Sequence, residues 1–206
     1  MPSQKLHYFN LNGLGESIRY LLHYGGQKFE DITYDYNSWP IKEVKDTLPY
    51  GQLPLYQEGS KSLNQSIAIA RYVANQVGLL PSDPWEQAVL DAFVFNVYDF
   101  WSSKYYNKLI VRGERRSSLK IKHELEEETV EFFFTRFEKT LKDNNGHFGG
   151  KLTWADFMLM GIVESTNLFL GTHIEDKYPN VKALIVKLKN LPGIKAYIAT
   201  RKEYKL

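Results

Sequence analysis

The chain has 206 residues, of which 43% are hydrophobic, and it contains no cysteine. This length is enough for one large domain or two small ones, each with its own buried core. Without cysteine, the chain can form no disulfide, thiolate-ligated zinc site or iron–sulfur cluster, and it can supply no cysteine nucleophile.

The charge is small and evenly spread. The net charge is +2, and residues 1–80 contain seven basic and seven acidic side chains. Because a nucleic-acid-binding protein usually presents a basic face or arm, we expect no nucleic-acid partner. The first residues lack the apolar core of a signal peptide, and the longest apolar windows, such as 157–163, are far shorter than the about 20 residues that span a membrane. We therefore expect a cytoplasmic protein with no membrane insertion.

The chain begins with alternating β-like and helical patterns. Residues 5–9 and 29–34 predict strands, and residues 13–25 predict a helix between them. A strand–helix–strand order is a βαβ unit, which implies that the two strands are parallel.

Two short strands and a helix complete this part of the chain. Residues 53–56 and 60–63 predict strands around a turn at Gly59, and residues 65–77 predict an amphipathic helix. The glycine, prolines and polar residues of 78–84 are typical of a linker.

After the linker we find only helical patterns. They cover residues 85–109, 119–141, 153–170, 179–191 and 193–200. The fold class is therefore α+β with two domains. We expect an α/β domain over 1–77, a linker over 78–84 and an all-helical domain over 85–206.

Residues 13–18, Gly-Leu-Gly-Glu-Ser-Ile, follow a predicted strand and open a predicted helix, as a dinucleotide-binding fingerprint does. Asp35 even lies at about the right distance for a ribose contact. However, Ile18 stands where the third glycine belongs, and the βαβ pattern stops after one unit. We therefore favour a role for the glycines in a tight turn.

Three further patterns have ordinary structural interpretations. The five histidines have no metal-ligand spacing, so we expect surface or capping histidines and no metal site. Thr153 and Asp156 form a capping box before an apolar run, which should stabilise the helix by about 1–2 kcal/mol. Basic residues followed by glutamates over 112–131 are typical of a solvated helix face.

Two features are compatible with ligand binding. Pro54 starts a β run, where a trans edge proline is the default and a cis Leu53–Pro54 bond is the alternative. Gln65 and Ser66 open a helix whose free amides could bind a carboxylate, although an ordinary cap is the simpler interpretation.

Five motifs that occur together in a fixed order favour the ligand-binding interpretation of these two features. They are Tyr8-Phe9-Asn10, Trp39-Pro40, Leu-Pro-Tyr-Gly-Gln-Leu-Pro at 48–54, Asn-Gln-Ser-Ile-Ala-Ile-Ala-Arg-Tyr at 64–72 and Leu-Thr-Trp-Ala-Asp-Phe at 152–157. With them the chain, from about Pro2 to Leu206, resembles the cytosolic glutathione transferases, specifically the sigma class, to which vertebrate hematopoietic prostaglandin D synthase belongs. The resemblance implies a thioredoxin-like N-terminal domain followed by an all-helical domain.

The resemblance implies that glutathione is a co-substrate and that no cofactor is bound permanently. Tyr8 matches the catalytic tyrosine of the family, whose hydroxyl donates a hydrogen bond to the thiolate and lowers the thiol pKa. The resemblance also implies contacts for the rest of glutathione. The backbone of Leu53, before Pro54, would pair with the cysteinyl part, and Gln65 and Ser66 would bind the γ-glutamyl end. Trp39 and Lys45 would contact the glycine end, with Lys42 as the alternative to Lys45, and Gln52 would line the same groove. Asp99 matches a residue that reaches glutathione in the other subunit, which implies a homodimer.

The chain departs from the vertebrate sigma members at two places. Leu14 stands where they have an arginine, and Phe95 and Tyr98 occupy two of three acidic metal-binding positions. Prostaglandin isomerase activity is therefore in doubt, and we predict no metal activation. The implied pocket for the hydrophobic substrate is lined by Leu11, Leu14, Tyr105, Met158 and Ile162.

The resemblance implies an enzyme of detoxification that conjugates glutathione to small hydrophobic electrophiles, such as lipid-peroxidation aldehydes, with peroxidase activity as a possible companion. The alternatives are a non-catalytic crystallin-like or ligand-carrier member and a glutathione-dependent prostaglandin D isomerase. A domain of thioredoxin type without its own thiol favours conjugation over thiol exchange.

Overall fold

The computed structural model describes residues 3–103 and 125–204. Contacts divide the chain into two compact units, of which the first combines Met1–Leu80 with Asn190–Leu206 and the second is Pro81–Lys189. The structure therefore groups the end of the chain with the N-terminal elements, whereas helical periodicity had assigned it to the second domain.

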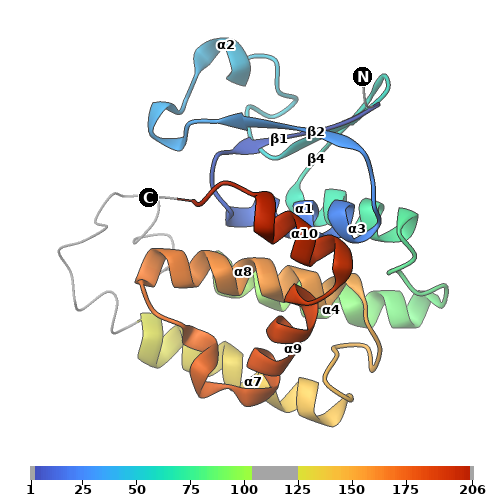
Figure 1. Cartoon of the computed structure of the whole chain (residues 1–206), viewed down its shortest axis with the longest axis vertical. Helices are drawn as coiled ribbons and strands as arrows, with labels where there is room; N and C mark the ends of the chain where they lie inside the picture. The colour runs from blue at the N-terminus through green and yellow to red at the C-terminus, as the bar shows by residue number, and fades with distance from the viewer. Residues whose placement is uncertain (1–2, 104–124, 205–206) are drawn as a thin grey trace. The chain divides into compact units, whose positions relative to one another are not determined.

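The first unit contains a four-stranded sheet of order β2-β1-β3-β4 (Figure 1). The strands are β1 Gln4–Phe9, β2 Phe29–Tyr34, β3 Leu55–Glu58 and β4 Lys61–Asn64. The predicted parallel pairing of the first two strands is confirmed, with Tyr8 opposite Thr33. The hairpin of β3 and β4 is antiparallel, and Gly59 makes its turn with a φ of 58°.

Two helices cover one side of this sheet, α1 (Glu16–Tyr24) and α3 (Ser66–Gln76), as Figure 1 shows. On the other side lies the four-residue helix α2 (Lys42–Lys45), which the sequence did not predict. Short 3-10 turns precede α1 and follow β2, η1 (Gly13–Gly15) and η2 (Tyr36–Ser38). The side chains of Leu6, Ile18, Leu21, Ile69 and Val73 are fully buried and form the core between the sheet and these two helices.

The last helix of the chain, α10 (Pro192–Thr200), packs on α1 in the same unit. The ring of Tyr197 stacks on that of His23 with centroids 4.1 Å apart. Gly193 allows the close approach, because a β-carbon there would lie 2.3 Å from the carbonyl oxygen of His23. This contact between residues far apart in sequence explains why helical periodicity alone assigned α10 differently.

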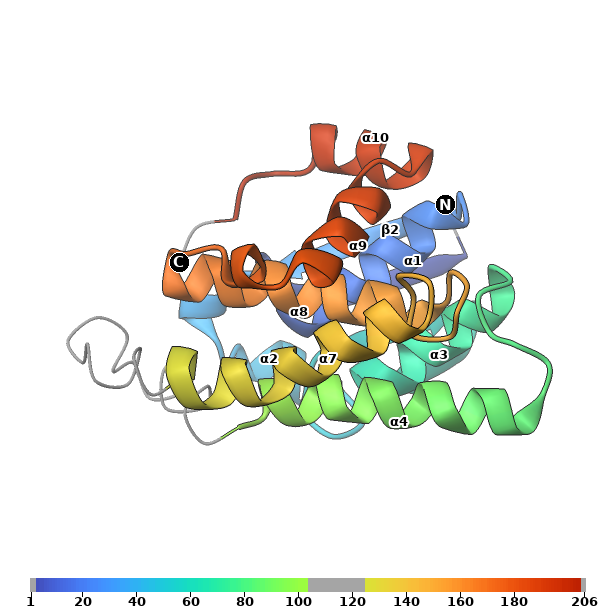
Figure 2. The same cartoon turned by 90° about the horizontal axis from the view of Figure 1, so that it is seen from below.

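The second unit is helical (Figure 2). It consists of α4 Pro84–Trp101, the π-helical turn η3 Leu125–Val130, α7 Glu131–Asp143, α8 Trp154–Leu170, the 3-10 turn η4 Ile174–Lys177 and α9 Pro179–Lys189. The helix predicted over 85–109 ends at Trp101, where Ser102 caps it, and its predicted end lies outside the described residues. The helix predicted over 119–141 begins, within the described part, as the π-helical turn.

The predicted capping box at the start of α8 is present. The Asp156 carboxylate accepts hydrogen bonds from the backbone N–H of Thr153 at 2.9 Å and of Phe148 at 3.1 Å. It also lies 3.1 Å from Nδ1 of His147, which is only 5% exposed. His147 is therefore a buried partner of a helix cap.

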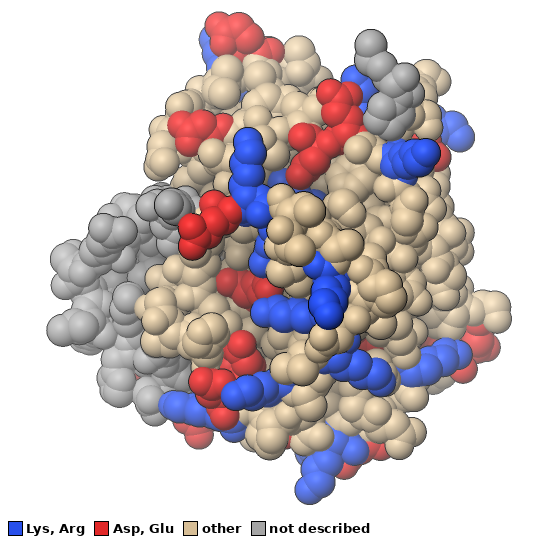
Figure 3. Space-filling model, in the orientation of Figure 1, with Lys and Arg blue, Asp and Glu red and all other residues tan. Residues whose placement is uncertain are grey.

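Charged side chains of both signs are interspersed on the face shown in Figure 3, where neither sign forms a continuous patch. Within the described ranges, no helix combines the length and apolar character that crossing a bilayer requires.

Candidate functional site

The predicted glutathione contacts of the first unit lie at one end of its sheet. β1 ends at Phe9, directly after Tyr8, and β4 ends at Asn64, directly before Gln65. β3 runs antiparallel to both and begins at Leu55, so its start, with Pro54 just before it, lies at the same end. Topology therefore brings three separate motifs to one edge of the sheet.

At this edge of the sheet, Tyr8 carries a buried hydroxyl group that can donate a hydrogen bond to a ligand. Its side chain is 5% exposed, and its hydroxyl oxygen accepts a hydrogen bond of 2.9 Å from the backbone N–H of Leu14. Burial raises the pKa of Tyr8 to about 12, against the lowering effects of the Leu14 amide and the Arg19 charge. The phenol is therefore neutral at physiological pH and keeps its hydrogen for donation. Because an amide already polarises the oxygen, this hydroxyl is a strengthened donor.

The two glycines of the Gly-Leu-Gly segment make room for the ring of Tyr8. A β-carbon at Gly15 would lie 2.3 Å from Cδ1 of Tyr8, and one at Gly13 would lie 2.5 Å from its hydroxyl oxygen. Gly13 also has a φ of 44°, which favours glycine. The segment therefore forms the tight turn favoured from the sequence, and the close approach of the tyrosine explains why both positions are glycine.

An aromatic cluster holds Trp39, which directly follows the 3-10 turn η2. The ring of Phe9 makes edge-to-face contacts with Trp39 and Tyr36, with centroids 5.3 and 5.2 Å apart. Tyr34 adds a contact to Trp39 at 6.4 Å. Such contacts are favourable aromatic geometries, so the indole is positioned by its neighbours before any ligand binds.

Gln65 has an unusual backbone conformation for a residue with a side chain. Its φ is 72°, a region that non-glycine residues rarely adopt, and it is exposed directly before the buried Ser66 that begins α3. Strain of this kind costs about 1–3 kcal/mol and clusters at functional sites. The conformation therefore supports a binding role for this helix start over an ordinary cap.

The loop before β3 carries the remaining predicted contacts. The Leu53–Pro54 peptide bond is cis, which is the alternative to the trans default, and Trp39–Pro40 is cis as well. Gln52 is exposed. The side chain of Lys45 lies along the same loop, because a β-carbon at Gly51 would be 3.1 Å from its Cε atom.

The rival lysine has a local partner. The ammonium of Lys42 forms an i,i+4 ion pair with Asp46 on the solvent side of α2. Lys42 is therefore engaged on its own helix, whereas the side chain of Lys45 lies along the loop before β3.

Asp99 and the predicted substrate residues of α8 are not brought to this edge by any described contact. Asp99 is exposed in the last turn of α4, the helix that also carries Phe95 and Tyr98. Of the predicted hydrophobic-substrate residues, Leu11 and Leu14 lie beside Tyr8 in the first unit, Met158 and Ile162 are buried in α8, and Tyr105 lies outside the described residues. Their predicted roles stay predictions.

Sequence reasoning missed three contributors to the site. The first is the backbone N–H of Leu14, which the identity of the side chain cannot reveal because nearly every residue type has this group. Glu16 and Arg19 are both fully buried in α1 and form an ion pair of 3.1 Å. Two charged residues on the buried side of a short helix are a recognisable signal, because charges are almost never fully buried unless they are paired.

Known proteins match this chain over its whole length. The model of the family "Glutathione S-transferase, N-terminal domain" matches residues 4–75, and that of "Glutathione S-transferase, C-terminal domain" matches residues 98–201. A glutathione S-transferase of Anopheles gambiae is 38% identical over 98% of each chain.

Two solved structures are similar in fold and sequence. A prostaglandin synthase D of Nilaparvata lugens superposes with a TM-score of 0.86 at 38% identity, over 98% of this chain and 100% of that chain. A glutathione S-transferase of the hookworm Necator americanus, described as monomeric, has a TM-score of 0.85 at 33% identity, over 98% of this chain and 99% of that chain.

Proposed function

Because the chain belongs to the glutathione S-transferase family, we propose that it conjugates glutathione to small hydrophobic electrophiles, with Tyr8 stabilising the thiolate. The observation that carries the proposal is the Tyr8 hydroxyl, which accepts a hydrogen bond from Leu14 and keeps its own hydrogen for a ligand. The invertebrate relatives and the motifs of the chain support an assignment to the sigma class.

In the proposed reaction the thiol of glutathione loses its proton to solvent, and the thiolate accepts a hydrogen bond from Tyr8. A free thiol has a pKa near 8.5, so only a few per cent is ionised at neutral pH. A hydrogen bond to the anion favours ionisation. The thiolate sulfur then forms a bond to an electrophilic carbon, and the electron pair leaves with a departing group or moves into a conjugated carbonyl.

The rest of glutathione occupies the edge of the sheet in this proposal. The backbone of Leu53 pairs with the cysteinyl part, while Gln65 and Ser66 bind the γ-glutamyl carboxylate at the start of α3. Trp39 and Lys45 contact the glycine end, and Gln52 lines the groove. The strained Gln65 and the aromatic cluster around Trp39 support the two ends of this arrangement.

Turnover of a chloronitrobenzene substrate by wild-type protein and by the Tyr8→Phe variant tests the role of Tyr8. We expect kcat/KM to fall about ten- to hundredfold, since a hydrogen bond to a charged group contributes about 1.5–3 kcal/mol. The matched control is Tyr72→Phe, which removes the 2.6 Å hydrogen bond from a tyrosine hydroxyl to the Glu58 carboxylate on an exposed surface. Equal rates in wild-type protein and Tyr8→Phe would exclude the role of Tyr8.

A second candidate function is isomerisation of a prostaglandin endoperoxide to prostaglandin D. The similar structure from Nilaparvata lugens, described as a prostaglandin synthase, favours it. Leu14, which replaces the arginine of vertebrate members, argues against it. Product analysis with the endoperoxide separates the two activities, and failure to bind immobilised glutathione would instead favour a non-catalytic carrier.

We also propose a homodimer in the cytoplasm. Asp99 is exposed on α4, as a residue that reaches the glutathione of a second subunit must be. A similar hookworm chain is described as monomeric. Analytical ultracentrifugation of the full chain measures its oligomeric state. A monomer at all concentrations would exclude a contact between Asp99 and glutathione in a partner subunit.

A further inference from the structure

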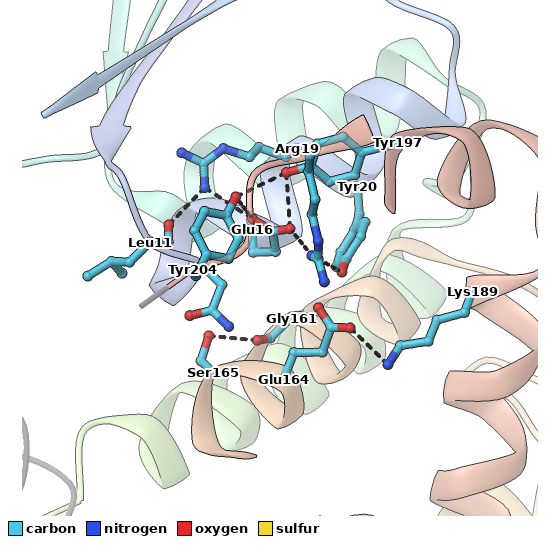
Figure 4. A network of polar contacts seen from close by, with 12 residues as sticks. Leu11, Glu16, Arg19, Tyr20, Gly161, Glu164, Ser165, Lys189, Tyr197 and Tyr204 are labelled. Carbon is cyan, nitrogen blue, oxygen red and sulfur yellow. Dashed lines mark hydrogen bonds and ion pairs between the residues drawn. The ribbon is translucent and has the colours of Figure 1, made fainter. Parts of the chain in front are cut away.

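Four hydrogen-bond donors converge on the buried carboxylate of Glu16, the first residue of α1 (Figure 4). Arg19 Nη1 donates at 3.1 Å from the same helix. The other three come from the C-terminal segment: the hydroxyl of Tyr197 at 3.1 Å, the hydroxyl of Tyr204 at 2.9 Å and the guanidinium of Arg201. Glu16 is 0% exposed, so its charge is stabilised by these groups in place of water.

The guanidinium of Arg19, which donates to Glu16, also holds the chain where it leaves β1. Arg19 Nη1 donates to the carbonyl of Leu11 at 2.9 Å, and Nη2 donates to the carbonyl of Phe9 at 3.1 Å. Its central carbon lies 5.7 Å from the ring centroid of Tyr8 and 5.9 Å from that of Tyr204. One arginine therefore contacts both the catalytic tyrosine and a tyrosine at the end of the chain.

We propose that Tyr204 and Arg201 are positioning residues for Tyr8, acting through Glu16 and Arg19. The inference rests on the proposed function, because it concerns the thiolate donor of that reaction. None of the motifs that carry the family resemblance includes a residue of 197–204.

The mechanism of this coupling is a competition for Arg19. Arg19 divides its donors between the Glu16 carboxylate, the Asp31 carboxylate at 2.8 Å, and the carbonyls of Phe9 and Leu11. While Tyr204 and Arg201 also donate hydrogen bonds to Glu16, Arg19 keeps its bonds to the two carbonyls. Loss of a donor leaves a buried carboxylate under-satisfied, and the guanidinium moves toward it. The turn after β1 then loosens, and the Leu14 amide no longer holds the Tyr8 hydroxyl in place.

The experiment measures the pKa of the thiol of bound glutathione, followed by the ultraviolet absorbance of its thiolate as pH is raised. The variants are Tyr204→Phe, Tyr8→Phe and the double variant, with Tyr72→Phe as the matched control. We expect Tyr204→Phe to raise the thiol pKa by about half a unit to one unit and to lower kcat/KM at neutral pH about three- to tenfold. We expect the KM for glutathione to stay within about twofold of wild type.

The double variant provides the readout that a general structural role would not produce. If Tyr204 acts through Tyr8, Tyr204→Phe has no further effect on the thiol pKa in the Tyr8→Phe background. Arg201→Gln removes a different donor from the same carboxylate, so it should shift the thiol pKa in the same direction and serves if Tyr204→Phe does not fold.

Two results overturn the proposal in distinguishable ways. A wild-type thiol pKa in Tyr204→Phe and Arg201→Gln, together with a raised one in Tyr8→Phe, excludes the positioning role and leaves the proposed function intact. A wild-type thiol pKa in Tyr8→Phe removes the thiolate donor itself, and both proposals fail.

Discussion

Gly15 has no side chain because the ring of Tyr8 occupies the space where one would stand. Its φ is not in the left-handed region, so backbone strain does not require glycine here. The requirement is steric, and it comes from a residue seven positions earlier. A glycine that looked like part of a nucleotide motif is therefore part of the tyrosine site.

At this position we predict that Gly15→Ala displaces the Tyr8 ring, since a β-carbon would lie 2.3 Å from it. The expected result is a loss of kcat/KM of about tenfold or more, with a loss of about 1–3 kcal/mol in the free energy of unfolding from overpacking. Steady-state kinetics and urea unfolding measure the two effects.

The control for this variant is Gly149→Ala. Gly149 also has an ordinary backbone conformation, and a β-carbon there would meet side-chain atoms of Leu90 and Thr153 no closer than 3.2 Å. The Gly149→Ala variant should leave kcat/KM unchanged. An active Gly15→Ala variant with wild-type kinetics would mean that the ring of Tyr8 has another position available to it.

The residues of the candidate site differ in how far the sequence could predict them. Tyr8, Gln65 and Trp39 are carried by motifs, so their types and order are visible in one dimension. The amide of Leu14 is not, because any residue type supplies a backbone N–H and only the turn aims it at the phenol.

Among the elements, one carboxylate from another helix accepts hydrogen bonds from the start of α9 in the second unit. The side chain of Glu138, on α7, accepts hydrogen bonds from the backbone N–H of Asn180 at 2.9 and 3.0 Å and of Val181 at 3.1 Å, at the beginning of α9. The Asn180 amide group adds a bond of 2.6 Å. A charge at this end also interacts favourably with the helix dipole.

We predict that Glu138→Gln lowers the free energy of unfolding by about 1–3 kcal/mol, because charged acceptors form the stronger hydrogen bonds. Urea unfolding followed by circular dichroism measures it. The control on the same helix is Asp143→Asn, which breaks only the exposed ion pair with Lys139 and should cost at most about 1 kcal/mol. Equal losses in both variants would show that Glu138 acts as a surface charge and not as a cap.

Periodicity predicted the existence of α7 and α9 but not this connection between them. Glu138 sits on a helix rich in charged residues, where sequence reasoning expects a solvated face. The capping box of α8 was predictable because its two residues lie three apart in sequence, whereas Glu138 and Asn180 lie 42 apart.

On the scale of the whole molecule, six tyrosines in the described part of the first unit have raised pKa values, and in four of them the shift is large. Burial raises the pKa of Tyr8 to about 12, and it is also the main cause of the raised pKa values of Tyr56, Tyr197 and Tyr204. The ordinary tyrosine pKa is 10.0, so the unfolded chain releases these protons first as pH rises. The stability that depends on the neutral phenols is complete below that value and is lost as pH rises toward the folded-state value.

We therefore predict that the free energy of unfolding is steady at mildly alkaline pH and falls steeply above about pH 10. Tyr8 alone should account for about 2–3 kcal/mol of this loss by about pH 12, at 1.36 kcal/mol for each pKa unit. Urea unfolding at a series of pH values measures the slope. A free energy that stays level across this range would contradict the prediction.

The matched variant is Tyr56→Phe. The Tyr56 hydroxyl is buried and has no hydrogen-bond partner among the described residues, so its removal leaves no orphaned group. We expect this variant to be at least as stable as wild type at neutral pH and to lose less stability above about pH 10. A slope equal to that of wild type would show that Tyr56 does not contribute to it.

Periodicity and motifs predicted the four strands, the longer helices, the family and the types of the residues that bind glutathione in our proposal. This information is local, because it depends on neighbours within one or two turns or on a short spacing between residues. The return of the last helix to the first unit is visible only in the fold. Because the last helix returns, Tyr204 at the end of the chain donates a hydrogen bond to Glu16, the buried partner of Arg19. No local pattern specifies this arrangement, because Glu16 and Tyr204 lie 188 residues apart and pair only once the core around them has formed.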